Sequence, residues 1–289
     1  MTVLAAQSVP GTGEGTGPSR GALAARCAGS SLLLLAVFIG GLLGYLFGAS
    51  RVQEAAVQSR LYSTFAAELG QDLGPLGPTS PGRPVAILDI PGIGVRNVII
   101  VEGTAAAQLD LGPGHLRNTP LPGQLGMSVV YGRRATFGAP FARLGDLRPG
   151  TQIVTYTQQG RAVYKVAAIG DSQHPVTDTS LNRLVLLTSS SAAVPAYYLE
   201  VDADLTTSAH NGPVQMPAIG PAEQAMASDS GALVLTMLWG LALVLTSIGG
   251  ALAAARWSGW PVYLIIAPAV LAILWNLYEN LAGLLPNLY

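Results

Sequence analysis

Two adjacent arginines lie in the part of the sequence best suited to carry chemistry. Arg133 and Arg134 follow a strand-like run and precede a glycine turn, in the stretch VVYGRRATFGAPF from Val129 to Phe141. Loops after strands commonly hold binding and catalytic groups. Arginine stays protonated and cannot act as a general base, but its planar donors suit a carboxylate, a phosphate or a peptide carbonyl.

The overall composition places the chain at a membrane and away from nucleic acid. Half of the 289 residues are hydrophobic, 11% are charged, and the mean hydropathy is +0.43. This is too apolar for an ordinary soluble domain. The net charge is −1, from 15 basic and 16 acidic residues, and the arginines are scattered. Without a basic stripe, nucleic acid is not an expected partner.

Three apolar segments are long enough to cross a bilayer, at residues 30–50, 231–255 and 262–283. Arg20 and Arg26 precede the first, and Arg256 lies in the turn 256–261 between the other two. Under the positive-inside rule these positions indicate a cytoplasmic N-terminus. We therefore expect a multi-pass protein of the plasma membrane with its central region outside the cytoplasm. Residues 1–29 are expected to be a disordered cytoplasmic tail, and residues 284–289 a C-terminal tail.

The region between the first and second membrane segments divides into three parts. Residues 51–82 contain a stalk helix, with Leu61, Phe65 and Leu69 on one face, and a Pro/Gly linker too poor in apolar residues to pack. Residues 83–206 consist of short β-rich runs separated by turns, which indicate a closed barrel or a sandwich. Residues 207–230 form a polar linker back to the membrane.

The membrane segments carry two patterns that suit helix packing. Gly40, Gly44 and Gly48 form a small-residue face that permits close approach of another helix. Polar residues gather near the end of the third segment: Asn276, Glu279 and Asn280. Both patterns are explained either by packing among the chain's own helices or by a partner protein.

The β-rich region resembles the sortase family, especially its class E-like actinobacterial members. The motifs that carry the resemblance are AILDIPGIGV, VEGT and LGPGHLRNTPLPGQLGMSVVYGRRATFGAPFARLGDLRPGTQI. The resemblance implies an eight-stranded sortase β-barrel on the outer face of a Gram-positive bacterium. It also implies cysteine transpeptidase chemistry, in which a sorting motif is cleaved and transferred to an amine. No cofactor and no metal are expected.

The positions of the family's catalytic residues are occupied by other side chains. The histidine position of the GHRTT-like turn holds Arg133, and the cysteine position at the end of LVLLTS holds Ser189, with Thr188 retained before it. The arginine position opening the last strand holds Tyr198. The only cysteine, Cys27, lies at the membrane edge. These substitutions predict a pseudo-sortase that is not an enzyme, since a serine hydroxyl needs an adjacent base.

We therefore expect a binding or scaffolding subunit of a cell-envelope or surface-protein assembly. In one interpretation Arg133 and Arg134 bind a ligand in the former catalytic cleft; in the other, Arg133 only fills it and Arg134 is solvated. His115, in the motif GPGH, is interpreted as structural. The candidate binding residues are Arg133, Arg134, Thr188, Ser189, Tyr198 and His115. Two alternatives are a residual serine hydrolase or transpeptidase using Ser189, and a regulator that sequesters substrates of an active sortase.

Overall fold

The computed structural model describes residues 20–174, 176, 180–192, 196–213, 216–256 and 260–289. The chain divides into two units, residues 1–43 and 44–289, which we describe separately. The first unit contains most of helix α1, Arg20–Gly44. The prediction of a disordered tail over residues 1–29 is therefore wrong from Arg20 onward, because the alanine-rich run GALAARCA favours a helix. The remainder of that tail, residues 1–19, lies outside the described residues, as do residues 257–259 of the predicted turn.

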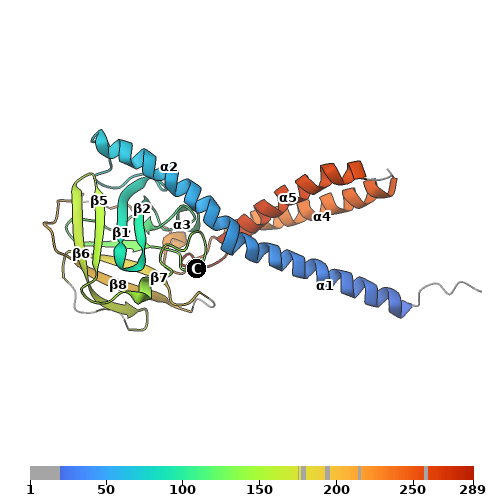
Figure 1. The fold of residues 1–289 in the computed structure, drawn as a ribbon, viewed down its shortest axis with the longest axis horizontal. Coiled ribbons are helices and arrows are strands. Elements are labelled where there is room, and N and C mark those ends of the chain that lie inside the picture. The colour runs from blue at the N-terminus through green and yellow to red at the C-terminus, as the bar shows by residue number, and fades with distance from the viewer. Residues whose placement is uncertain (1–19, 175, 177–179, 193–195, 214–215, 257–259) are drawn as a thin grey trace, which may run out of the picture. The chain divides into compact units, whose positions relative to one another are not determined.

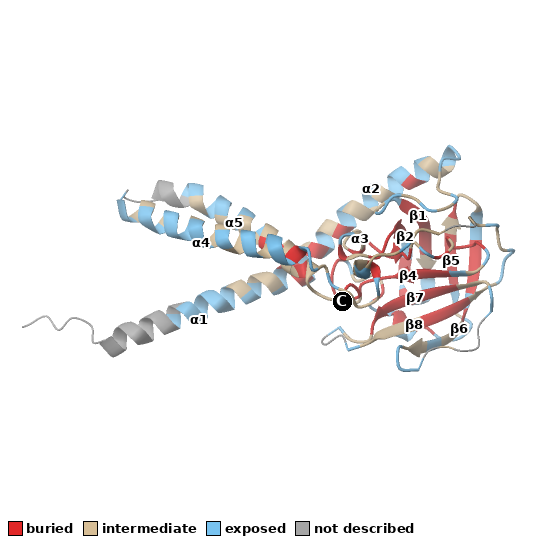
Figure 2. Cartoon of the chain, turned by 180° about the vertical axis from the view of Figure 1, so that it is seen from behind, coloured by how far each residue is buried: buried red, intermediate tan, exposed pale blue. Residues whose placement is uncertain are grey.

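Three helices in the described residues are long and apolar enough to cross a membrane: Ser31–Gly70, Ala232–Arg256 and Leu264–Gly283. The first includes a π-helical turn η1, Tyr45–Ala49, and continues as helix α2, Ser50–Gly70. The other two are α4, Ala232–Arg256, and α5, Trp260–Gly283, which lie side by side in Figure 1. Figure 2 shows that their surfaces are largely exposed in the isolated chain. Apolar side chains on an exposed helix surface are stable in lipid, which suits these three helices to insertion in a membrane.

The second unit contains a closed eight-stranded barrel (Figure 1). Its strand order is β1-β2-β3-β4-β7-β8-β6-β5. The strands are β1 Pro84–Ile90, β2 Val95–Glu102, β3 Gly114–His115, β4 Met127–Tyr131, β5 Gln152–Thr157, β6 Gly160–Asp171, β7 Arg183–Ser189 and β8 Tyr198–Leu205. Short helices join them: η2 Pro91–Ile93, α3 Ala106–Leu109 and η3 Leu144–Asp146; a further one, η4 Pro221–Glu223, follows the barrel. The predicted fold class is confirmed.

Strands β4 and β7 run parallel and present two different faces. Val129 pairs with Val185, and Tyr131 pairs with Leu187. Because side chains alternate along a strand, Val130, Leu184 and Leu186 enter the barrel core, while the four paired residues point outward. The outward residues are nevertheless buried. Other parts of the chain must therefore cover this outer surface.

Helix α2 packs along β1 and β2. Phe65 is fully buried against Ile87 and Ile99. The side-chain amide of Gln58 donates to the carbonyls of Ile99 (3.1 Å) and Leu111 (2.7 Å), and its oxygen accepts from the Ile99 N–H at 2.7 Å. These bonds satisfy main-chain groups of Ile99 and Leu111 through a side chain of α2. Helix α2 is therefore fixed to the barrel by both apolar and polar contacts.

The Pro/Gly linker after α2 also contacts the barrel, which corrects the expectation that it cannot pack. The Gly74 N–H donates to Gln158 Oε1 at 3.0 Å, and the Gln124 amide donates to the Leu76 carbonyl at 2.8 Å. Apolar content alone therefore does not decide whether this linker packs against the barrel. Glutamine side chains of the barrel hold this linker through its main chain.

Two of the residues predicted to mediate helix packing form local hydrogen bonds within α5. The amides of Asn276 and Asn280 donate to carbonyls one turn earlier in α5, at 2.8 and 2.7 Å. Among the described residues, nothing lies within 4 Å of a Cβ placed on Gly44 or Gly48. The part of the glycine face in this unit is open to close approach, and its role in packing stays a prediction, as does that of Gly40 and Glu279.

Candidate functional site: the turn after β4 and the face that it borders

The turn from Gly132 to Phe141 is held in an unusual backbone conformation. Phe137 and Ala139 have φ angles of 47° and 50°, a region that residues other than glycine rarely adopt. The Phe137 N–H donates to Ser50 Oγ of α2 at 3.2 Å. A Cβ on Gly132 would collide with the ring of Phe141. Strained turns of this kind persist only where surrounding contacts fix them, and they are common at functional sites.

Arg133 points inward from this turn and is fully buried. Its Nη2 donates to Asp110 Oδ1 at 2.6 Å, and its guanidinium lies 4.8 Å from the centre of the Phe137 ring. Further contacts at 3.4 Å reach the Ala106 carbonyl and Thr136 Oγ1. Burial raises the pKa of the Asp110 carboxyl, and the Arg133 charge opposes that rise. A ligand carboxylate would therefore have to replace Asp110 to bind Arg133.

The other predicted site residues lie together at the ends of β7 and β8. Arg134 Nη1 donates to the Ser189 carbonyl at 3.0 Å, and Thr188 Oγ1 donates to the Gly132 carbonyl at 2.8 Å. Tyr198 is the register partner of Ser189. Arg134 therefore contacts the predicted nucleophile position, whereas Arg133 turns away toward α3.

The Ser189 hydroxyl is buried and bonded to the chain itself. It donates to the Ser191 carbonyl at 2.9 Å and lies 3.4 Å from the Ser191 N–H. To attack a substrate carbonyl, this hydroxyl would have to leave the Ser191 carbonyl and transfer its proton to a base. Both of these contacts within the described residues are to main-chain groups of Ser191, and neither can take the hydroxyl proton as a general base.

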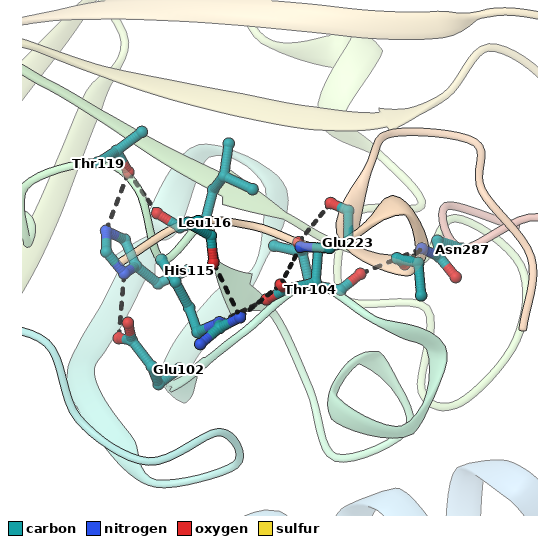
Figure 3. Close-up of polar contacts among 11 residues, drawn as sticks. Glu102, Thr104, His115, Leu116, Thr119, Glu223 and Asn287 are labelled. Carbon is teal, nitrogen blue, oxygen red and sulfur yellow. Dashed lines mark hydrogen bonds and ion pairs between the residues drawn. The ribbon is translucent and has the colours of Figure 1, made fainter. Parts of the chain in front are cut away.

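His115 belongs to a separate polar network with Glu102 and Thr119 (Figure 3). Its Nδ1 lies 3.1 Å from Glu102 Oε2, and its Nε2 lies 3.0 Å from the Pro120 carbonyl and 3.1 Å from Thr119 Oγ1. The ring is almost completely buried. Its contacts lie among β2, β3 and the loop after β3, and none of those drawn reaches Ser189.

A buried apolar surface borders the turn, and we call it the β4–β7 face. It consists of Leu109, Leu116, Val129, Tyr131, Val185 and Leu187. Leu288, near the end of the sequence, is fully buried against this face. Ile219, Ala225 and Met226 of the linker after the barrel also pack on it. The linker and the C-terminal tail together cover the β4–β7 face.

The tail reaches the turn through main-chain hydrogen bonds. The Arg134 N–H donates to the Leu288 oxygen at 3.1 Å. The N–H groups of Ala135 and Thr136 both donate to the main-chain oxygen of Tyr289, at 2.8 and 3.2 Å. Three consecutive donors of the turn are thereby satisfied by two residues of the tail.

The linker is fastened by a bidentate ion pair. Arg117 Nε and Nη2 lie 2.6 Å from the two oxygens of Glu223. Thr104 Oγ1 donates to the Glu223 carbonyl at 2.6 Å, as Figure 3 shows. The hydrogen bonds from Arg117 lower the pKa of the Glu223 carboxyl, which stays ionised at neutral pH. The expectation of a polar linker missed this attachment.

Acidic residues of β8 continue the outer surface beyond the apolar residues. Glu200 pairs with Leu187, and Asp202 pairs with Val185. Asp202 is fully buried, and Arg183 Nε lies 3.6 Å from its Oδ2. Burial, together with the charge of Asp202, raises the pKa of Glu200 to about 7. Burial also raises the pKa of Asp202.

Comparison with known proteins agrees with this architecture. Residues 88–193 match the family model described as the sortase domain. The barrel is a sortase domain. A curated relative, Sortase D of Bacillus subtilis, is 31% identical over 118 residues, which are 41% of this chain and 52% of that protein. The chain thus matches about half of the length of this relative.

Solved structures of sortases are similar to the same part of the chain. A Clostridium perfringens Sortase D5 transpeptidase is 22% identical, with a TM-score of 0.46, over 53% of this chain and 99% of that one. Sortase E from Streptomyces avermitilis is 29% identical, with a TM-score of 0.39, over 45% of this chain and 91% of that one.

The family match contradicts the expectation that the chain is not an enzyme. The sortase domain matched over residues 88–193 is that of a family of transpeptidases. The expectation rested on three side-chain types, Arg133, Ser189 and Tyr198, at positions inferred from short motifs. Those substitutions remove one set of reactive groups, yet Ser189 keeps a nucleophile at the end of β7. The absence of a cysteine there does not establish inactivity.

Several residues of the site were not foreseen from the sequence: Asp110, Thr104, Arg117, Glu223, Asn287 and Leu288. A usable signal existed for the last two. The segment LLPNLY follows a membrane helix and carries large apolar side chains, which are stable outside the bilayer only when they are buried. Asp110 and Glu223 had no local signal, because their arginine partners are distant in the sequence.

The buried Arg133–Asp110 pair provides a stability prediction. Arg133→Met leaves the Asp110 carboxylate without its partner and should lower the free energy of unfolding by about 3–5 kcal/mol. The double variant Arg133→Met with Asp110→Leu should recover most of this loss. The matched control is Arg143→Met, which breaks the exposed pair with Asp146 and should cost at most about 1 kcal/mol. Denaturant unfolding of the full chain in detergent measures the free energy of unfolding of all three variants. Equal decreases for Arg133→Met and Arg143→Met would contradict a structural role of the Arg133–Asp110 pair.

Glu200 provides a pH prediction. Its folded pKa of about 7 exceeds the ordinary glutamate value of 4.5, so the folded state retains a proton that the unfolded state loses between these pH values. Stability should therefore fall as the pH rises from about 4.5 to 7 and then level off. Glu200→Gln should remove this contribution and raise the thermal midpoint more at pH 8 than at pH 5. A shift of the same size at both pH values would refute the assignment.

Proposed function

We propose that this chain is a membrane-anchored sortase-domain protein that binds an extended peptide segment of a cell-envelope or surface protein on its β4–β7 face. The observation that carries the proposal is the set of main-chain bonds from Arg134, Ala135 and Thr136 to the chain's own tail, at Leu288 and Tyr289. An apolar surface beside a row of N–H donors that bond an extended segment through its main chain is a common arrangement for binding peptides. In this role the protein acts as a binding or scaffolding subunit of an envelope assembly.

The proposed topology places the N-terminus in the cytoplasm and the barrel outside it. Arg20, Arg26 and Arg256 support this orientation under the positive-inside rule. Three candidate membrane helices support integral insertion into the plasma membrane. The barrel would then face proteins of the cell envelope.

Acyl transfer through Ser189 is a second candidate function. The position of this serine at the end of β7, with its carbonyl held by Arg134, favours it. In such a reaction Ser189 Oγ would attack a peptide carbonyl and expel the leaving amine, giving an ester. An incoming amine would then displace the serine oxygen and restore the hydroxyl. Both steps need a proton acceptor for the attacking group.

Affinity capture from the native membrane tests binding on the β4–β7 face. Leu187→Arg places a charge on that face and should reduce recovery of the co-purifying envelope protein at least ten-fold. Leu181→Arg is the matched control, because Leu181 is 90% exposed, and should leave recovery unchanged. The unfolding midpoint of each variant is measured alongside. Equal recovery with folded Leu187→Arg and with wild type would refute the proposal.

Intact-mass analysis of the same preparations tests the second candidate. An acyl adduct that appears on incubation with a peptide ester, and disappears in Ser189→Ala, would establish transfer chemistry. Wild-type protein that shows no adduct under these conditions would leave binding as the supported function.

A further inference from the structure

The C-terminal tail occupies the β4–β7 face as a peptide ligand would. Leu288 is fully buried among the apolar residues of the face, and its oxygen accepts a hydrogen bond from the Arg134 N–H. The oxygen of Tyr289 accepts from the next two N–H groups of the turn. These main-chain bonds fix the direction and register of the segment without depending on its sequence.

Asn287 adds a contact that does depend on sequence. Its side-chain Nδ2 points at three main-chain carbonyls: Ala222 at 2.7 Å, Thr104 at 3.2 Å and Gln224 at 3.3 Å. Figure 3 shows this amide directed toward Thr104 beside Glu223. The residue is fully buried. A pocket lined by carbonyl oxygens accepts a side-chain donor and repels a carboxylate of the same shape.

Main-chain hydrogen bonds join the end of α5 and the tail to the linker that precedes α4. The Asp229 N–H, just before α4, donates to the Gly283 carbonyl at the end of α5 at 3.0 Å. The Asn287 N–H donates to the Ala227 carbonyl at 2.8 Å. The tail is therefore held near the face at a high effective concentration, and a peptide from another protein must compete with it.

From these contacts we infer that residues 284–289 are an internal ligand that blocks the β4–β7 face, and that the face accepts peptides of the same chemistry from other proteins. The preferred ligand is an extended segment in which a side-chain amide donor precedes a branched aliphatic residue. This inference rests on the proposed function, because it specifies the peptide and the regulation of the same face. Binding of a second protein requires release of the tail.

A competition experiment with the purified full chain tests this inference. The probe is the peptide LLPNLY with a fluorophore at its amino end, and a second peptide carries Asp in place of Asn. Asn287→Asp weakens the tail by an isosteric change, so this variant should bind the first peptide at least ten-fold more tightly than wild type does. Leu288→Ser should have the same effect by an independent route. To each variant, the peptide with Asp should bind at least ten-fold more weakly than the peptide LLPNLY.

A matched control and a second readout keep the outcomes distinct. Asn211→Asp makes the same chemical change at an exposed position of the linker and should leave peptide affinity at the wild-type value. Equal affinity of wild type and both tail variants would overturn the inference, as would equal binding of the two peptides. If no peptide binds but capture of an envelope protein still depends on Leu187, the internal-ligand inference fails while the proposed function stands. If capture is also independent of Leu187, both fail.

Discussion

The turn after β4 carries three main-chain N–H groups, those of Arg134, Ala135 and Thr136, whose hydrogen-bond acceptors lie outside the barrel strands. Such donors must be satisfied when they are buried, because an unpaired buried donor is costly. In this protein the acceptors come from Leu288 and Tyr289. The position of the tail beside the β4–β7 face meets this requirement.

The turn can present those donors because its other contacts hold it rigidly. Arg133 is directed inward by Asp110, and Phe137 is fixed by Ser50 of α2. Tyr45 links the same region to the membrane helices: its ring lies 6.4 Å from Phe137 and 5.3 Å from Trp275. The turn, the stalk helix and the end of α5 therefore form one packed junction.

Much of the architecture was predictable from the sequence because it depends on local patterns. Short runs such as VAILDI and LVLLTS identify strands, and uninterrupted apolar segments identify membrane helices. The sortase resemblance predicted the closed barrel. The start of α1 at Arg20 was missed, because a helix can extend beyond its apolar segment wherever helix-forming residues continue.

The site was less predictable because its important pairs are distant in sequence. Arg133 and Asp110, Arg117 and Glu223, and Asn287 and Thr104 each join different segments. Motif comparison pointed to Ser189, Arg134 and Tyr198 but did not predict that the linker and the C-terminal tail cover the neighbouring surface. The expectation of a non-enzyme failed for a related reason. It treated three side-chain identities as proof of lost chemistry, whereas residues 88–193 match the family model of the sortase domain.

The central claim is that the tail satisfies the turn and closes the β4–β7 face. Amide hydrogen exchange of the full chain in lipid nanodiscs tests it most directly, at residues 134–136 and 284–289. We expect slow exchange at the three turn amides in wild type and at least ten-fold faster exchange there in Leu288→Ser, with the amides of β1 and β2 unchanged. Equally fast exchange of the turn and tail amides in wild type, at the rate of an unstructured peptide, would contradict it.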